Sequence, residues 1–97
     1  MRYDVIFAPE AVKDAQRLKP YLRPLVREAI EQSLRHAPAR VSKSRIKRLR
    51  GVSRPQFRLR AGEVRVFYDV RATTVDILAI VPKSEAARWL KQEGTRE

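Results

Sequence analysis

The chain has 97 residues, of which 43% are hydrophobic and none is cysteine. This length fits a single domain over residues 1–97 with one small core, and the lack of cysteine excludes disulfides, thiolate metal sites and a cysteine nucleophile. A formal charge of +11 and a pI near 11.1 favour RNA, DNA, the ribosome or an acidic protein as partner.

The N-terminal residues include the acidic Asp4 and only a short apolar run, so no secretory signal is expected. The longest apolar run, residues 77–82, is too short to span a membrane. Together with the absence of cysteine, these features predict a cytoplasmic protein without a membrane partner.

The first third of the chain predicts a strand followed by two helices. Residues 1–8 alternate as a strand, with Tyr3, Val5 and Phe7 on one face. Pro9 suits the first position of a helix that continues to about residue 19. A second helix is expected between residues 20 and 36 and forms a hairpin with the first. Its apolar face comprises Leu22, Leu25, Val26, Ala29, Ile30, Ser33 and Leu34.

The remaining two thirds predict strands and a terminal helix. Residues 37–44 form a loop, and the basic segment 43–51 is a short strand or extended arm. Three strands are expected over residues 57–61, 63–70 and 74–81, and the last is apolar on both faces and therefore central in the sheet. Residues 84–92 form a short helix that Gly94 closes. The order β-α-α, three or four strands, then α predicts an α+β fold with an antiparallel-rich sheet and its helices on one face.

The segment FRLRAGEVRVFYDV, residues 57–70, predicts a hairpin with a cluster of arginines on one face. With Ala61–Gly62 as a two-residue turn, Arg60 opposes Glu63 and Arg58 opposes Arg65. The core face then comprises Phe57, Leu59, Val64, Val66 and Tyr68. A three-residue turn would place charges in the core, so the hydrophobic pattern selects the register.

Three neighbouring arginines repel one another, which lowers the stability of the fold. We therefore favour a bound anion as the reason for such a cluster. Arginine offers planar, paired donors to a phosphate. The patch could be widened by Lys47, Arg48 and Arg50 before the hairpin and by Lys83 after the last strand. The alternative is that the arginines simply form a solvated outer face of the sheet.

Three motifs resemble the RelE/ParE superfamily of toxins from type II toxin–antitoxin systems, nearer to its RelE, or mRNA interferase, branch. They are RLRG at residues 48–51, the hairpin at 57–70, and ILAIVPKSEA at 77–86. The resemblance covers nearly the whole chain and implies a RelE-like fold. It does not by itself separate ribosome-dependent ribonucleases from gyrase poisons.

For the ribonuclease branch, the resemblance implies cleavage of mRNA on the ribosome by the substrate's own 2′-OH, without a metal or other cofactor. Arg58, Arg60, Arg65 and Lys83 would then be the catalytic residues, and Arg65 would contact the scissile phosphate. RNA contacts are expected from Lys47, Arg48, Arg50, Ser84 and Trp89.

The chain departs from that branch at three places. Arg58 and Arg60 stand where the branch often has lysines, and a guanidinium is a poor proton acceptor. Ser84 stands in place of the second basic residue of a terminal pair. Trp89 occupies the region where some members have a Tyr or His for proton transfer; it could stack on a base, although packing in the core or against an antitoxin is the plainer interpretation.

Apart from the resemblance, the sequence offers few catalytic groups. His36 is the only histidine, at a helix end, and Glu63 is the only acid on the arginine face. No metal-ligand cluster, glycine-rich phosphate loop or Ser/His/Asp set is present. Two other functions stay open, a gyrase-directed toxin without nuclease activity and a non-catalytic RNA-binding module.

Any toxin function implies a cognate antitoxin, RelB-like or Phd/YefM-like, in a hetero-oligomer with the toxin. An acidic or amphipathic antitoxin segment is expected to wrap the domain and to cover part of the basic face and an apolar groove. The terminal helix, with Ala86, Ala87, Trp89 and Leu90, is a plausible docking or displaced element.

Overall fold

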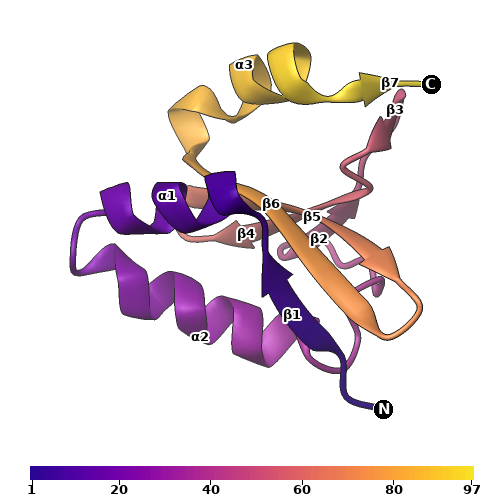
Figure 1. The fold of residues 1–97 in the computed structure, drawn as a ribbon, viewed down its shortest axis with the longest axis horizontal. Helices are drawn as coiled ribbons and strands as arrows, with labels where there is room; N and C mark the ends of the chain where they lie inside the picture. Colours follow the sequence, from indigo (N-terminus) through magenta and orange to yellow (C-terminus); the bar gives the residue numbers. More distant parts are fainter.

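The centre of the fold is a five-stranded sheet in the order β1-β6-β5-β4-β2 (Figure 1), seen in a computed structural model that describes residues 1–97. Only β1 and β6 pair in parallel, and the other neighbours are antiparallel. The expected α+β class is confirmed. The strands are β1 (Asp4–Phe7), β2 (Ile46–Arg48), β4 (Phe57–Ala61), β5 (Val64–Arg71) and β6 (Thr74–Pro82).

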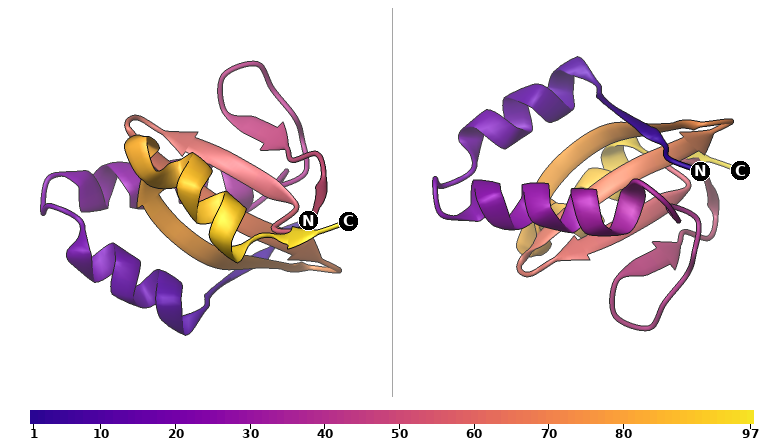
Figure 2. Two further views of the ribbon diagram at one scale, coloured as in Figure 1. Left: turned by 90° about the horizontal axis from the view of Figure 1, so that it is seen from above. Right: turned by 90° about the horizontal axis from the view of Figure 1, so that it is seen from below.

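Helices α1 (Pro9–Arg17) and α2 (Leu22–Leu34) form the predicted hairpin on one face of the sheet (Figure 2). Pro9 begins α1, where its missing N–H is not needed. The main core lies between this hairpin and the sheet and includes Leu34, Leu59 and Tyr68. The Tyr68 ring stacks on Phe57 with centroids 5.5 Å apart. Its hydroxyl donates to the carbonyl of Pro38 at 2.6 Å.

The opposite face of the sheet is covered by α3 (Lys83–Glu93), as the view from above shows (Figure 2). The expectation that the helices share one face is therefore wrong for α3. A second, smaller core lies under this helix and contains Leu49, Val52 and Phe67, with Trp89 and Leu90 packed against it. The sequence did not reveal this second core, because Phe67 lies on the same side of β5 as Arg65, and that side was assigned to the arginine cluster.

A two-stranded sheet that the sequence did not reveal holds the end of α3. Strand β3 (Val52–Arg54) pairs antiparallel with β7 (Thr95–Arg96). Both strands are too short to show a period. Leu25 also differs from expectation, because it is 54% exposed although it was assigned to the apolar face of α2.

Beyond the end of β1, one edge of β6 is closed by a side chain instead of a strand. β1 pairs with β6 only as far as Phe7 opposite Ile77. The pairing of β6 with β5 is irregular just after this point. The carboxylate of Asp14 on α1 accepts the backbone N–H of Ile80 at 3.0 Å, which gives a part-buried donor its partner. None of the helices has the length and apolar composition needed to cross a membrane.

Candidate functional site

The β4–β5 hairpin turns at Gly62–Glu63, one residue later than predicted. Ala61 pairs with Val64, Arg60 with Arg65, and Arg58 with Phe67. The predicted pairs, Arg60 with Glu63 and Arg58 with Arg65, are therefore wrong by two residues. A shift of two preserves the faces, because side chains alternate with a period of two. Gly62 takes a positive φ of 60°, which suits the first position of this tight turn.

Arg58, Arg60 and Arg65 do share one face, as predicted, and they interact electrostatically. Burial lowers the pKa of Arg58, and the charge of Arg60 lowers it further. The pKa of Arg65 is lowered by burial first and then by Arg58 and Arg60, while Glu63 opposes the change. The positive charge of Arg60 thus lowers the pKa of both Arg58 and Arg65, and that of Arg58 lowers the pKa of Arg65 as well. A bound anion would relieve this repulsion.

The three guanidiniums are not equally available to a ligand. Arg65 is 5% exposed, and its Nη1 donates to the carbonyls of Gly62 at 2.7 Å and of Val64 at 3.1 Å. Arg58 is half-buried, and its Nε is buried without a hydrogen-bond partner. Arg60 is exposed at the end of the strand. The unpaired donor of Arg58 and the free Arg60 make these two the better candidates for holding an anion.

The residues that were expected to widen the arginine face do not all lie on the same face of the sheet. Lys47 lies directly opposite Arg58 and therefore on the same face. Arg48 lies opposite Phe57 and on the other face, with its guanidinium carbon 5.1 Å from the centre of the Phe57 ring. The expectation that Arg48 extends the arginine face is therefore wrong. Arg50 is exposed in the bend after β2.

The start of α3 lies beside the hairpin turn. The backbone N–H of Lys83 donates to the carbonyl of Glu63 at 2.8 Å, and the side chains of Lys83 and Ser84 are exposed. Trp89, further along the helix, stacks on Phe67 with ring centroids 4.7 Å apart and planes 14° apart. One face of the indole is thus used for packing, which agrees with the plainer interpretation of this residue.

Groups suited to proton transfer are scarce around the cluster. Glu63 is exposed in the turn itself. Asp69 accepts the backbone N–H of Gln56 at 2.7 Å and pairs with the Arg54 Nε at 3.1 Å. His36 lies 3.4 Å from the Met1 carbonyl oxygen, at the far end of α2. No group of three His, Asp or Glu side chains is placed to hold a metal ion.

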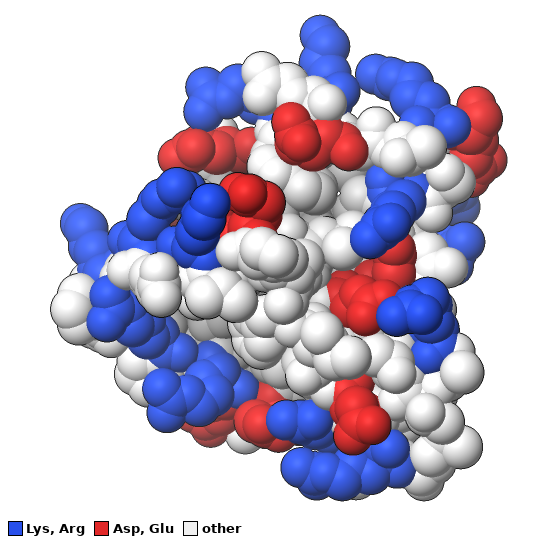
Figure 3. Space-filling model, viewed as in Figure 1, with Lys and Arg blue, Asp and Glu red and all other residues white.

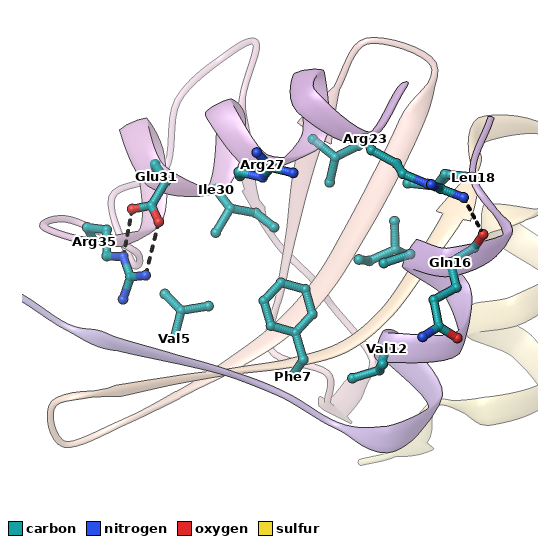
Figure 4. A pocket seen from close by; sticks show the side chains of 13 residues that line it. Val5, Phe7, Val12, Gln16, Leu18, Arg23, Arg27, Ile30, Glu31 and Arg35 are labelled. Atoms are coloured by element: carbon teal, nitrogen blue, oxygen red, sulfur yellow. Dashed lines mark hydrogen bonds and ion pairs between the residues drawn. The ribbon is translucent and has the colours of Figure 1, made fainter. Parts of the chain in front are cut away.

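An apolar groove of about 480 Å³ lies between β1 and the helical hairpin (Figure 4). Phe7 and Val12 line it from one side and Ile30 from the other, while Arg23 and Arg27 stand at its rim. One end is closed by an ion pair between Arg35 Nε and Glu31 Oε2 at 2.7 Å. Phe7 is 38% exposed and Val12 is 43% exposed, so this surface is unpartnered.

Charged side chains of both signs surround this part of the molecule. In Figure 3, a continuous uncharged area in the middle of the view is bordered by many Lys and Arg side chains, with Asp and Glu side chains between them. The positive charge is therefore spread over the surface and is not confined to the arginine face. An acidic partner can be attracted to either surface.

Comparison with known proteins identifies the family. Residues 5–87 match the sequence model of the ParE toxin of the type II toxin–antitoxin system parDE. The chain belongs to this family, within the RelE/ParE superfamily of toxins. No curated protein sequence matches it.

Solved structures share the fold of this toxin. A chain of the toxin–antitoxin complex RelBE2 from Mycobacterium tuberculosis is 31% identical, with a TM-score of 0.69 over 84% of this toxin and 99% of that chain. A chain of the archaeal RelE–RelB complex from Pyrococcus horikoshii is 27% identical, with a TM-score of 0.69 over 86% and 97%. A mutant of the E. coli toxin RelE in the free state, at 21% identity and a TM-score of 0.69 over 94% and 93%, shares the fold.

Sequence reasoning missed two features of the toxin's surface. Arg45 lies beside Arg60, because the backbone N–H of Arg60 donates to the Arg45 carbonyl at 2.8 Å. Pairing of β2 with β4 would have predicted this neighbour. Glu28 and Gln32 of α2 also approach the hairpin turn, across a cleft. No local pattern reveals that approach, since it depends on how α2 crosses the sheet.

Proposed function

We propose that this toxin inhibits translation by cutting mRNA on the ribosome, with the substrate's own 2′-OH as nucleophile. The observation that supports this most directly is the arginine face, where Arg58 has a buried Nε without a partner beside the exposed Arg60. Fixed cations of this kind stabilise charge that develops on a phosphoryl group.

The reaction needs few protein groups. The 2′ oxygen attacks the adjacent phosphorus in line as its proton passes to solvent or to the ribosome, the bond from phosphorus to the 5′ oxygen breaks, and that oxygen takes up a proton. The products are a 2′,3′-cyclic phosphate and a 5′-OH. Arg58 and Arg60 neutralise the phosphorane, and Lys83, the first lysine after the hairpin and exposed at the start of α3, protonates the leaving oxygen. Positioning of the RNA supplies much of the acceleration.

The proposed activity is tested by primer extension on a translated message. Wild-type toxin should produce cuts, and Arg58→Ala and Arg60→Ala should each lower the cleavage rate about a hundredfold. Arg40→Ala removes the same charge from an exposed loop and should retain the rate. An intact message during toxic expression of the wild type would exclude this mechanism.

A second candidate is a gyrase-directed toxin without nuclease activity. The match of residues 5–87 to the ParE family supports it, and so does the shortage of proton-transfer groups. This candidate predicts DNA damage while translation continues. Salt-sensitive binding to naked RNA without toxicity would instead indicate a plain RNA-binding module.

The proposed partner is a cognate antitoxin, RelB-like or Phd/YefM-like. The M. tuberculosis and P. horikoshii relatives are chains of toxin–antitoxin complexes. The unpartnered apolar groove, with Arg23 and Arg27 at its rim, suits an amphipathic segment with acidic flanks. Co-purification with the product of a neighbouring short gene tests this partner.

A further inference from the structure

A second cleft lies between α2 and the tip of the β4–β5 hairpin. Its volume of about 490 Å³ falls within the range of small-ligand sites, about 300–1,000 Å³. Its apolar lining consists of Leu25, which is 54% exposed, and the small, nearly buried Ala29 and Ala61. The polar lining includes Glu28, Gln32, Arg45 and Arg60. The cleft therefore combines a surface that a flat ring can lie on with groups that can bind its edge.

Arg60 belongs both to this cleft and to the arginine face. The backbone bond from Arg60 to the carbonyl of Arg45, 2.8 Å long, holds the loop that carries Arg45 beside the hairpin. A phosphate bound by Arg60 would therefore lie at the mouth of the cleft. The base of the same nucleotide can then reach the cleft, whose lining also includes Arg45 as a cation for a neighbouring phosphate.

Glu28 is an exposed carboxylate that lines a basic cleft and forms no ion pair with either arginine. Its one side-chain hydrogen bond is the one that its Oε1 accepts from Gln32 Nε2 at 3.0 Å. A carboxylate repels an RNA backbone, but it accepts hydrogen bonds from a base. Among the bases, guanine presents two parallel donors, N1–H and the N2 amine, on its Watson–Crick edge, and a carboxylate can accept both.

We propose that this cleft binds a guanine base of RNA, with Glu28 accepting from N1–H and N2–H and with Arg60 holding the adjacent phosphate. Single-stranded RNA is commonly recognised through base edges in this way. The biological meaning of the site rests on the proposed mRNA cleavage, whereas its ability to bind guanine can be measured without any cleavage.

The direct test is titration of the ¹⁵N-labelled toxin with guanosine 5′-monophosphate and with inosine 5′-monophosphate, which lacks the N2 amine. Guanosine monophosphate should shift the backbone amides of Gln32, Arg45 and Ala61 and should bind about tenfold more tightly than the inosine nucleotide, as expected for one bidentate contact. Equal affinities, or shifts confined to other parts of the fold, would overturn the proposal.

Two variants separate recognition from charge. Glu28→Gln should remove the preference for guanosine over inosine, because an amide cannot accept both donors. Glu93→Gln loses the same charge on exposed α3 and should keep the preference. Retention of the preference in Glu28→Gln would refute the role of Glu28.

Mapped cuts on a translated message then test the site in the reaction. Wild-type cuts should favour guanine at one fixed position beside the cleaved bond, and Glu28→Gln should lower that preference about tenfold. Cutting with the same base pattern in both proteins would count against the proposal. If the wild type leaves the message intact, the cleavage hypothesis fails, and the nucleotide titration still decides whether the cleft binds guanine. Amide shifts in the cleft that appear only with the antitoxin would make it a protein interface and overturn the proposal.

Discussion

The guanidinium of Arg65 donates to two carbonyl oxygens of its own hairpin and is almost fully buried. Arg65→Ala leaves these carbonyls without their charged donor. We expect the free energy of unfolding to fall by about 2 kcal/mol, since a hydrogen bond to a charged group contributes about 1.5–3 kcal/mol and a single Nη1 serves both carbonyls. Arg60→Ala, at an exposed position, should change it by less than about 0.5 kcal/mol. Urea denaturation measures both, and equal effects would contradict a structural role for Arg65.

Tyr68 makes the stability sensitive to alkaline pH. Burial raises the pKa of its hydroxyl above the ordinary value of 10.0. Above about pH 10 the unfolded chain loses this proton while the folded chain keeps it, so the free energy of unfolding should fall as the pH rises. The urea midpoint measured from pH 9 to 11 should therefore drop. Tyr68→Phe should flatten the drop, whereas Tyr21→Phe, at a residue 66% exposed, should not.

The residue-scale predictions from sequence succeeded where they depended on alternation. Alternation correctly placed Arg58, Arg60 and Arg65 on one face, because a register error of two leaves the faces unchanged. It could not show that the Arg65 side chain folds back onto Gly62. The direction of this side chain depends on the geometry of the hairpin turn, and the sequence allowed the turn to lie at more than one position.

Helix α3 packs on the sheet through Ala86, Trp89 and Leu90, and the largest of these, Trp89, stacks on Phe67 at 4.7 Å. No residue of this helix is fully buried. Trp89→Ala should therefore release α3 from the sheet at a cost of about 2–3 kcal/mol, below the range for fully buried aromatic residues. Hydrogen exchange should show faster exchange in α3 with the central strands still protected. The exposed Arg88→Ala is the matched control, and loss of protection throughout the sheet would contradict this expectation.

Strand β1 separates two surfaces, because Phe7 lines the groove while its neighbour Ile6 points to the other face. Phe7→Glu should weaken antitoxin binding at least about tenfold, since it places a charge in the proposed apolar contact. Ile6→Glu, at a residue 52% exposed, should bind the antitoxin as the wild type does. Calorimetric titration measures both. Equal losses in the two variants would argue against the groove as the binding surface.

At the scale of elements, the sequence predicted every helix and every long strand within a few residues. Pro9, Pro20 and Pro38 bound the two N-terminal helices, and the three hairpin-connected strands alternate clearly. Pairing between β3 and β7 was not predictable, because strands of three and two residues have no measurable period. The sequence also did not determine which face of the sheet α3 covers, since no feature within the helix specifies that face.

The whole molecule carries a net charge of +11, so its binding to single-stranded RNA should weaken steeply with salt. Each phosphate contact adds about 0.7 to the slope of log K against log salt concentration. Arg58→Ala should therefore lower the magnitude of the slope by about 0.7, measured by fluorescence anisotropy between 50 and 200 mM salt. Arg40→Ala, in an exposed loop, should leave the slope nearly unchanged. The same slope in wild type and Arg58→Ala would mean that Arg58 does not contact the backbone.

The parallel pairing of β1 with β6 places Asp4 opposite Thr74, so the first strand to be synthesised must wait for the last strand of the main sheet. At about 5–20 residues per second, the wait is several seconds. During that time β1 and the helical hairpin are present without the strand that completes their core. A fully folded toxin thus exists only after nearly the whole chain has been made. The proposed antitoxin, if it is already present in the cell, would have this interval in which to meet the nascent chain before the domain closes.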